Sequence, residues 1–486
     1  MKETFYDIFR KLNSIPRPSH HEEKVADFLC QFAESHGLRY RRDKENCVVI
    51  EKDATPGCEG AEPVVILNHM DMVCVARDGY LRDGRQFNPL KDEIKAYTET
   101  DADGVRWMKA EGTSLGADNG MGLSMALAVL ADDSIVHPAL EVLTTTNEED
   151  GMSGAEALSK DFIRGRKVIN LDSEAYNEIT TGAAGACLQL GKWNAERKSI
   201  PQGFKTYKIT LDGGLGGHSG VDINKGRCNA IKELCCALTE CDVLVCSLNG
   251  GNANASIASW AEAVIAIPTT DVSSVENCVA ELKGSLIEKF SVTDKDVDVR
   301  MEVAADEKQC LANGQQLLQC VAALPCGVQA MRVDMPDTVM TSNNIGMLRT
   351  TDEIVTISCH TRSFEMDEQN KLSASIKGTM TENGAKEVEL LMNTGAWMER
   401  ADSPLLELTC QTFKDVLGFE PKKVAMHFVL EAAYYVEKYP GVEIASIGPL
   451  IIEPHSPSER VNLNTADNIW KVTLELLRRL SSADDN

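Results

Sequence analysis

The sequence lacks the features of several common protein classes. No stretch approaches the ~18 consecutive apolar residues of a membrane-spanning helix, and Met1–Phe5 lack the apolar core of a signal peptide. Basic residues are in deficit, since 49 lysines and arginines stand against 74 aspartates and glutamates, for a formal charge of −25. That charge argues against nucleic acid and against anionic membranes as partners.

A disulfide or zinc framework built on cysteine is also absent from the pattern. The 16 cysteines are scattered without a Cys-x-x-Cys pair, and Cys235 and Cys236 are the only adjacent two. Several lie in apolar text of helical period, where free cysteine packs as a small hydrophobic side chain. We therefore expect reduced thiols and a cytoplasmic location.

The order of apolar segments predicts an α/β fold with an inserted domain. Short β-forming runs alternate with segments of helical period, which indicates a mixed sheet flanked by helices; the runs include 64–67, 140–146 and 168–171. Between about 205 and 303 the order becomes β-α-β-β-α-β, the ferredoxin-like pattern, and a partial second copy follows. We predict a catalytic domain made of 1–184 and 399–486, interrupted by an α+β domain at 185–398.

Polar clusters end the apolar strands of the α/β domain. In a parallel sheet, ligands bind beyond the carboxyl ends of the strands, and the clusters fall at or near such places: Asn68-His69-Met70-Asp71, 116–120, 147–150, 171–174 and 453–457. Imidazole and carboxylate ligands without thiolate suit zinc, manganese or cobalt. Two imidazoles and several carboxylates exceed the needs of one zinc, so we expect two metal ions bridged by a carboxylate.

Two pairs of neighbouring side chains suggest a division of labour. One carboxylate of Glu148-Glu149 can bind metal while the other accepts a proton from the attacking water, whose pKa the metal lowers. Asp71, two residues past His69, can accept a hydrogen bond from the imidazole and fix its tautomer.

Each cluster taken alone has an ordinary structural interpretation. His69 could be a surface histidine, Asp118 could cap the helix expected from 121, and Glu148-Glu149-Asp150 could form a solvated acidic turn. Near the N-terminus, Ser19 and Glu22 have the spacing of a capping box. Three successive apolar strands that all end in acid or imidazole text favour the metal site over these interpretations.

A glycine-rich segment, Asp212-Gly-Gly-Leu-Gly-Gly-His218-Ser219-Gly220, stands apart from these clusters. It fails the dinucleotide-binding fingerprint, because Ser219 occupies the position of the last required glycine. It is either a flexible hairpin or a loop whose glycines let His218 project into a cleft.

As an ordered set, these motifs resemble the di-zinc exopeptidases of the aminoacylase and glutamate carboxypeptidase type. The similarity is closest to the aminoacyl-histidine dipeptidases, a subgroup also called peptidase D or cytosol non-specific dipeptidase, and it spans nearly the whole chain. The text around Ile15-Pro-Arg-Pro-Ser19, Ser446-Ile-Gly-Pro449 and His455-Ser-Pro-x-Glu-Arg also resembles that subgroup.

The resemblance implies a role for each candidate residue. It implies His69 and Asp172 on one metal, Glu149 and His455 on the other, and Asp118 bridging both. Glu148 would be the general base and later the acid, and Asp71 would orient His69. His218 would stabilise the oxyanion, and Arg362 would lie near the substrate carboxylate; an exposed salt bridge is the alternative for Arg362. The inserted domain would act as lid and dimerisation surface.

The sequence also departs from the subgroup at the lid. Ala255 replaces an expected polar residue, and Val429-Leu430-Glu431-Ala432-Ala433 replaces the usual Gly-Leu-Glu-Cys-Gly. We expect a cytoplasmic homodimeric dipeptidase of broad specificity that hydrolyses unblocked dipeptides, including those with C-terminal histidine. It would use two divalent ions, Zn²⁺ before Mn²⁺ or Co²⁺. An N-acyl amino-acid amidohydrolase and a catalytically silent metal-holding peptide binder remain as alternatives.

Overall fold

The computed structural model describes residues 4–482 and divides the chain into two compact units. The terminal unit contains both chain ends and consists of Met1–Gly182, Met398–Ala425 and Glu431–Asn486. The inserted unit consists of Ala183–Trp397 together with the short segment Met426–Leu430. The segment Met426–Leu430 thus follows the insertion in the chain but belongs to the inserted unit, which the sequence pattern did not indicate.

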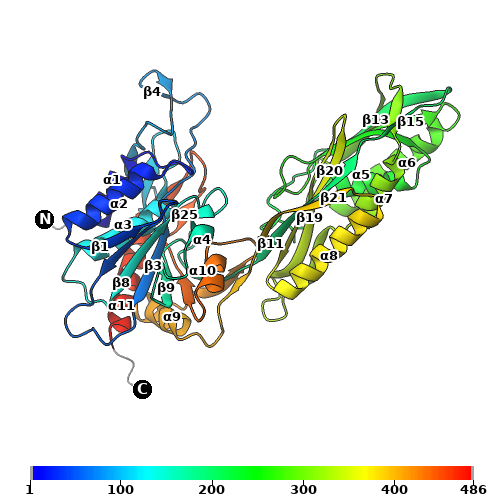
Figure 1. The fold of residues 1–486 in the computed structure, drawn as a ribbon. Coiled ribbons are helices and arrows are strands. Elements are labelled where there is room, and N and C mark those ends of the chain that lie inside the picture. Colours follow the sequence, from blue (N-terminus) through cyan, green and yellow to red (C-terminus); the bar gives the residue numbers. More distant parts are fainter. Residues whose placement is uncertain (1–3, 483–486) are drawn as a thin grey trace. The chain divides into compact units, whose positions relative to one another are not determined.

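The terminal unit is built on a nine-stranded mixed sheet (Figure 1). Its order is β1 (Arg39–Arg42), β2 (Val48–Lys52), β8 (Leu140–Thr145), β3 (Val64–His69), β9 (Lys167–Asn170), β24 (Glu443–Ser446), β10 (Glu178–Ala183) and β22 (Trp397–Met398), with β23 (Lys422–Met426) paired to β10. The central strands β8, β3, β9 and β24 are parallel. Their carboxyl ends therefore share one edge of the sheet.

Helices cover both faces of this sheet, with α1, α2 and α3 on one side and α4 and α10 on the other (Figure 1). The helices are α1 (Phe5–Asn13), α2 (Glu23–Ser35), α3 (Ala117–Ala131), α4 (Ser153–Ala157), α9 (Pro404–Leu417), α10 (Ala432–Lys438) and α11 (Leu463–Leu480). Two small sheets complete the unit: β25 (Ile451–Ile452), β26 (Arg460–Asn462), β7 (Arg106–Ala110) and β6 (Ala96–Thr100) form one, and β4 (Leu81–Arg82) with β5 (Arg85–Gln86) the other.

Strand β3 is buried on both faces, which explains its continuous apolar run. Val64 and Ile66 pack into the core formed with α1, α2, α3, α9 and α11, and the alternation of a strand turns Val65 and Leu67 to the opposite face. All four are at most 1% exposed. Burial of such side chains stabilises a fold by roughly 1.5–3 kcal/mol each, so the strand is a rigid base for His69 at its end.

The inserted unit is a nine-stranded sheet made of two ferredoxin-like halves. Its order is β16 (Asp298–Val303), β13 (Phe204–Asp212), β15 (Ala261–Pro268), β14 (Leu244–Gly250), β19 (Val339–Thr350), β20 (Ile354–Ser363), β11 (Gly185–Asn194) and β21 (Glu387–Thr394), with β18 (Gly327–Met331) paired to β19. Helices α5 (Ala230–Thr239), α6 (Val272–Phe290), α7 (Gly314–Ala323) and α8 (Met366–Glu382) contribute to its core. The short strands β12 (Arg197–Ser199) and β17 (Gln309–Leu311) pair separately.

The second half is complete, because two strands that the sequence pattern missed belong to it. Strand β11 precedes the whole first half in the chain but pairs with β20 and β21 of the second, and β19 pairs with β20. Each half then has the same strand order within the sheet, with its fourth strand beside its first. The pairing of β11 with β20 joins residues 160 to 178 positions apart, a separation that local periodicity does not report.

Within residues 4–482, the structure has no helix that combines the length and apolar character needed to cross a membrane.

Candidate metal centre and active site

Three neighbouring parallel strands deliver the candidate residues to one edge of the terminal sheet. His69 is the last residue of β3 and pairs with Thr145 at the end of β8, two residues before the cluster that contains Glu148 and Glu149. Leu67 pairs with Asn170 at the end of β9, two residues before Asp172. The parallel register therefore brings the three polar clusters to the same height at the sheet edge.

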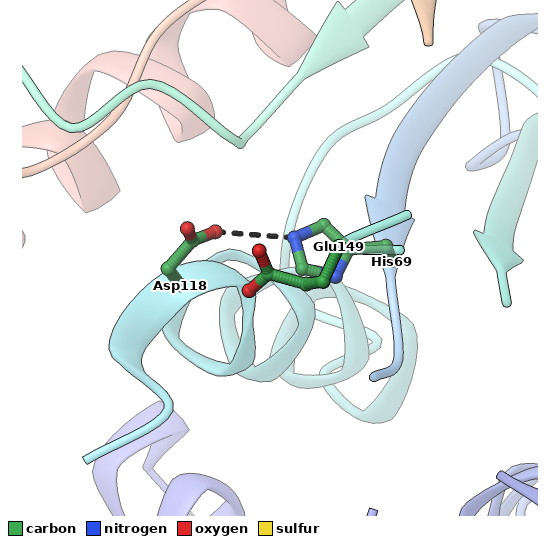
Figure 2. A group of neighbouring side chains, drawn as sticks. All are labelled: His69, Asp118 and Glu149. Atoms are coloured by element: carbon green, nitrogen blue, oxygen red, sulfur yellow. Dashed lines mark hydrogen bonds and ion pairs between the residues drawn. The ribbon is translucent and has the colours of Figure 1, made fainter. Parts of the chain in front are cut away.

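Asp118 lies between the two candidate histidines. Its Oδ1 is 3.1 Å from His69 Nε2 (Figure 2), and its Oδ2 is 3.2 Å from His455 Nε2. The side chain is 11% exposed. A single carboxylate thus presents one oxygen to each imidazole, and the two imidazoles come from positions 386 residues apart in the chain.

A second carboxylate accompanies each histidine. Asp172 Oδ1 is 3.2 Å from His69 Nε2, and Glu149 Oε2 is 2.7 Å from His455 Nε2. The five side chains at 69, 118, 149, 172 and 455 therefore converge. Two overlapping groups have their ligand atoms within 4.8 Å of one another: His69, Asp118 and Glu149, and Asp118, Glu174 and His455.

The local backbone frees Asp118 for this position. Helix α3 starts at Ala117, after Gly116, whose φ of 69° is left-handed, but the helix is interrupted at Asp118 and Asn119 and becomes regular only after them. Asp118 itself has non-helical dihedral angles of φ −80° and ψ 115°. From the sequence, helix capping was an alternative role for Asp118. In the structure, both of its carboxylate oxygens face the histidines instead.

The electrostatics of the cluster are strongly anionic. Hydrogen bonds to Asp118 and Glu149 raise the pKa of His455 to about 11. Burial by itself would lower the pKa of His69, but the nearby Asp172 and Asp118 raise it well above its usual value. In the other direction, burial raises the pKa of Asp172 to about 6. Such an environment favours any cation that enters it.

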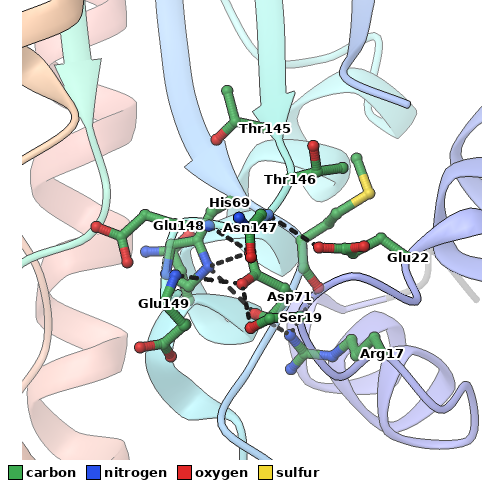
Figure 3. Close-up of polar contacts among 12 residues, drawn as sticks. Arg17, Ser19, Glu22, His69, Asp71, Thr145, Thr146, Asn147, Glu148 and Glu149 are labelled. Carbon is green, nitrogen blue, oxygen red and sulfur yellow. Dashed lines mark hydrogen bonds and ion pairs between the residues drawn. The ribbon is translucent and has the colours of Figure 1, made fainter. Parts of the chain in front are cut away.

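Asp71 holds together the segments that carry the other residues (Figure 3). Its carboxylate accepts hydrogen bonds from the backbone N–H of Glu148 at 3.1 Å and of Glu149 at 3.2 Å, and from the Ser19 hydroxyl at 2.8 Å. His69 Nδ1 lies 3.1 Å from the Asp71 carbonyl oxygen and 3.4 Å from its carboxylate. Asp71 therefore fixes the imidazole and the Glu148-Glu149 backbone at once.

The capping box expected at Ser19 and Glu22 does not form. Helix α2 has no side-chain cap at Glu22, because both side chains are used in the site: Ser19 bonds to Asp71, and Glu22 Oε1 accepts the N–H groups of His20 and Asn147. Tertiary partners have displaced the local ones, and the Asn147 bond steadies the loop that carries Glu148 (Figure 3).

Glu148 is half-buried within the cluster. Burial is the largest cause that raises its pKa well above the usual value, and the charges of Asp172, Glu431 and Glu149 add to it. Figure 3 shows the Glu148 side chain extending away from Asp71, while the Asp71 carboxylate accepts the backbone N–H of Glu148. A carboxylate with a raised pKa beside candidate metal ligands has the properties of a general base.

The donor set fits divalent cations. Oε1 of Glu149 is buried and has no hydrogen-bond partner among residues 4–482, so one lone-pair site in the cluster is unsatisfied by protein groups. The converging atoms are imidazole nitrogens and carboxylate oxygens, which zinc, manganese and cobalt accept. A buried anionic cluster of this kind is stable only when cations or protons compensate it.

Comparison with known proteins assigns the chain to a family. The model of peptidase family M20/M25/M40 matches residues 65–479. The chain belongs to peptidase family M20/M25/M40. This family consists of metal-dependent peptidases, so divalent metal ions are expected at the centre described above.

Two relatives resemble this M20 chain over nearly its whole length. The cytosol non-specific dipeptidase of Escherichia coli (strain K12) is 34% identical over 484 residues, which cover 98% of each chain. The crystal structure of aminoacylhistidine dipeptidase from Vibrio alginolyticus superposes with a TM-score of 0.86 at 32% identity, over 98% of this chain and 96% of that one. A Staphylococcus aureus tripeptidase, 15% identical over 99% of both chains with a TM-score of 0.59, shares the fold.

In this M20 chain, His218 and Arg362 lie together in the inserted unit. Arg362 is 3% exposed, and its Nη2 lies 3.4 Å from Ser219 Oγ. The Nδ1 of His218 accepts hydrogen bonds from the N–H groups of Gly220 and Val221, which leaves the proton on Nε2. Burial and then Arg362 lower the pKa of His218 to about 4, so the imidazole is a neutral donor at pH 7.

The same part of the inserted unit holds two further histidines. His427 Nε2 lies 2.8 Å from Ser342 Oγ, and burial followed by the Arg362 charge lowers its pKa to about 3. The pKa of His360 is lowered well below its usual value by the same causes. Arg362 is therefore buried and is not an exposed salt-bridge partner. Burial and the Arg362 charge together keep His218, His360 and His427 uncharged.

Two acidic residues of the terminal unit were not assigned from the sequence. Glu174 offers a ligand atom close to Asp118 and His455, and its position two residues after Asp172 was the available signal. Glu431 is buried, and burial raises its pKa to about 8 with a further contribution from the Asp172 charge. Its sequence context gave little signal, because the surrounding residues depart from the related motif.

Proposed function

We propose that this chain is a metal-dependent dipeptidase that hydrolyses unblocked dipeptides. The observation that carries the proposal is the shared carboxylate of Asp118, which offers one oxygen toward His69 and the other toward His455. Such an arrangement suits two metal ions about 3.5–4 Å apart. The names of the two full-length relatives, both dipeptidases, support the substrate class.

In this proposal the five converging residues hold two divalent ions. His69 and Asp172 would hold one, Glu149 and His455 would hold the other, and Asp118 would be shared by both. Zn²⁺ fits the donors best, with Mn²⁺ or Co²⁺ as alternatives. When bound, the ions lower the pKa of a water molecule toward neutrality and polarise the scissile carbonyl. Asp71 keeps His69 oriented through contacts at 3.1 and 3.4 Å.

Glu148 is the proposed general base. Its carboxylate accepts a proton from the attacking water and later donates it to the leaving amine. Its backbone is fixed by the 3.1 Å hydrogen bond to Asp71, so the side chain starts from a defined place beside the ligands. Burial raises its pKa, which makes it a stronger base than an exposed glutamate.

The inserted unit supplies the proposed substrate contacts. His218 is neutral with its proton on Nε2, and this N–H stabilises the oxyanion of the tetrahedral intermediate. Arg362 is buried with an Nε that lacks a hydrogen-bond partner in the described part of the chain. We propose that it receives the substrate carboxylate, which would satisfy its charge.

We further propose a homodimer in the cytoplasm. Within the described residues all 16 cysteines are free thiols, as expected of a reducing compartment. The inserted unit exposes large apolar side chains, including Val292, Val303 and Leu390, and serves as the dimerisation surface in this proposal. Sedimentation analysis of the purified protein tests the dimer.

The decisive experiment is a substrate panel on metal-loaded enzyme. We expect hydrolysis of free dipeptides such as Ala-His, its loss on chelation, and recovery on addition of Zn²⁺ or Mn²⁺. Faster hydrolysis of N-acetyl amino acids would instead identify an N-acyl amidohydrolase. Tight dipeptide binding without turnover, at two metals per chain, would identify a silent binder and refute the proposal.

A further inference from the structure

We propose that Glu459 and Arg17 are positioning residues that hold the Asp118 segment in a fixed place relative to the segments carrying His69 and His455. The inference deepens the proposed function and rests on it, because the residues that are positioned are the proposed metal ligands. Neither residue received a role from the sequence. The side chains of both residues form hydrogen bonds with backbone N–H or C=O groups of the segments that they hold.

Glu459 binds the start of helix α3 from the far end of the chain. Its Oε2 accepts the N–H groups of Leu115 at 2.7 Å and Gly116 at 2.9 Å, and its Oε1 accepts those of Ala117 at 2.7 Å and Asp118 at 3.4 Å. The residue is 3% exposed. The free N–H groups and positive dipole end of a helix favour an anion at this place.

Because Glu459 follows His455 by four residues, this contact connects two ligand-bearing segments. One segment carries the bridging Asp118, and the other carries His455, 337 residues later. Any displacement of the Glu459 carboxylate therefore changes the distance between Asp118 and His455. Oδ2 and Nε2 are 3.2 Å apart, and both atoms would hold the same ion in the proposed centre.

Arg17 connects the same helix start to the His69 segment. Its Nη2 donates to the carbonyl oxygen of Gly116 at 2.7 Å, and its Nη1 donates to those of Met70 and Asp71, both at 3.0 Å. It is 1% exposed, and Figure 3 shows it beside Asp71. The turn at Gly116 is thus held on its N–H side by Glu459 and on its carbonyl side by Arg17.

This packing explains both glycines of the Gly116-Ala-Asp-Asn-Gly120 motif. A Cβ at Gly116 would lie 2.6 Å from Arg17 Nη2, and one at Gly120 would lie 2.5 Å from the same atom. Real Cβ atoms essentially never come so close, so a side chain at either position would require the Arg17 guanidinium to shift. Glycine at both positions therefore leaves space for the Arg17 side chain, and Gly116 also permits the turn that presents Asp118.

The test compares two buried glutamates that make the same kind of contact. In Glu459→Gln, an amide donor faces backbone donors, and we expect metal affinity to fall about 10–100-fold. We also expect kcat to fall while KM for the dipeptide stays within about threefold, with partial rescue by excess Zn²⁺. Affinity is measured against a competing chromophoric chelator, and kcat with Ala-His.

Glu141→Gln is the matched control. Glu141 is 1% exposed and accepts the N–H groups of Arg164 and Gly165 at 2.7 and 2.8 Å and the Arg164 Nε–H at 3.0 Å. These contacts lie at the amino ends of β8 and β9, opposite the ends that the proposed ligands follow. We expect a similar loss of Tm in both variants, with metal affinity and kcat changed only in Glu459→Gln. Equal metal affinity and kcat in the two variants would overturn the proposal.

Two further variants keep the test usable if Glu459→Gln does not fold. Glu459→Asp keeps the charge but shortens the reach, and Arg17→Lys keeps the charge but loses the fork; each should show the same loss of affinity and kcat, to a smaller degree. Unchanged affinity and kcat in both would also overturn the inference. A wild-type protein that binds no divalent metal would instead refute the proposed function itself.

Discussion

The two units of this protein hold histidines in opposite electrostatic surroundings. In the terminal unit, hydrogen bonds to Asp118 and Glu149 raise the pKa of His455 to about 11. In the inserted unit, burial and the Arg362 charge lower the pKa of His218 to about 4 and of His427 to about 3. The same side chain is driven toward the charged form in one unit and the neutral form in the other.

The difference indicates what each cluster is built to receive. Carboxylates that outnumber imidazoles leave a negative site, which divalent cations neutralise. A buried arginine among neutral imidazoles leaves a positive site, which a carboxylate or an oxyanion neutralises. In the proposed function, the negative cluster receives the metal ions and the positive cluster receives the substrate carboxylate.

The largest expected effect is the loss of the proposed base. Glu148→Gln should lower kcat by about 10²–10⁴-fold, because the amide cannot accept the proton of the attacking water. Metal content, measured by elemental analysis, should stay at the wild-type value, since Glu148 is not one of the proposed ligands. A variant with full metal content and wild-type turnover would refute the assignment.

In the inserted unit, Arg362→Met should lower kcat/KM for dipeptides by about 10–100-fold. The reason is the loss of a charge-assisted hydrogen bond to the substrate carboxylate, which contributes about 1.5–3 kcal/mol. The loss should be much smaller for the corresponding dipeptide amide, which has no carboxylate to bind. Equal losses for both substrates would place Arg362 elsewhere than at the carboxylate.

Removal of metal should destabilise one unit and spare the other. Without cations, the carboxylates of Asp118, Glu149 and Asp172 repel one another, so we expect Tm to fall by roughly 5 °C or more, as follows from a loss of ~3 kcal/mol of binding energy. Hydrogen exchange should then increase at 68–71 and 116–120 but not in β13 or β20. An increase spread over both units would contradict this division.

Acid should act on the inserted unit through His427. Its pKa is lowered on folding, from 6.5 to about 3, so the unfolded chain binds the proton first. Its contribution to stability is present above pH 6.5 and is lost as pH falls toward 3, by about 1.4 kcal/mol per unit of pH. In His427→Gln this part of the pH dependence should be missing. If Tm fell equally in the variant and the wild type between pH 7 and 4.5, the prediction would be wrong.

The smallest expected effect concerns the third acid of the Glu148-Glu149-Asp150 run. The Asp150 side chain is 75% exposed and pairs with the exposed His20, at 2.8 Å. Exposed pairs contribute 0–1 kcal/mol, so Asp150→Asn should change kcat/KM by less than about twofold. A larger change would mean that an exposed charge beside Glu148 and Glu149 affects catalysis.

Much of the candidate centre could be predicted from local sequence. His69 follows a strand of unbroken apolar residues, and Glu148 and Asp172 follow two more, so the parallel sheet itself brings these three together. The capping box at Ser19 and Glu22 was wrong, because both side chains bind groups that lie 50 or more residues away. Strand β11 was missed for the same reason, since its partners β20 and β21 are distant in the chain.

The sequence by itself determined which segments are buried strands and which residue types end them, since periodicity and composition are local properties. Only the tertiary structure decided that Asp118 faces two histidines instead of capping its helix, and that Glu459 and Arg17 hold it there. Those contacts join residues 49 to 344 positions apart. Their geometry depends on how sheet and helices pack, which a local pattern does not contain.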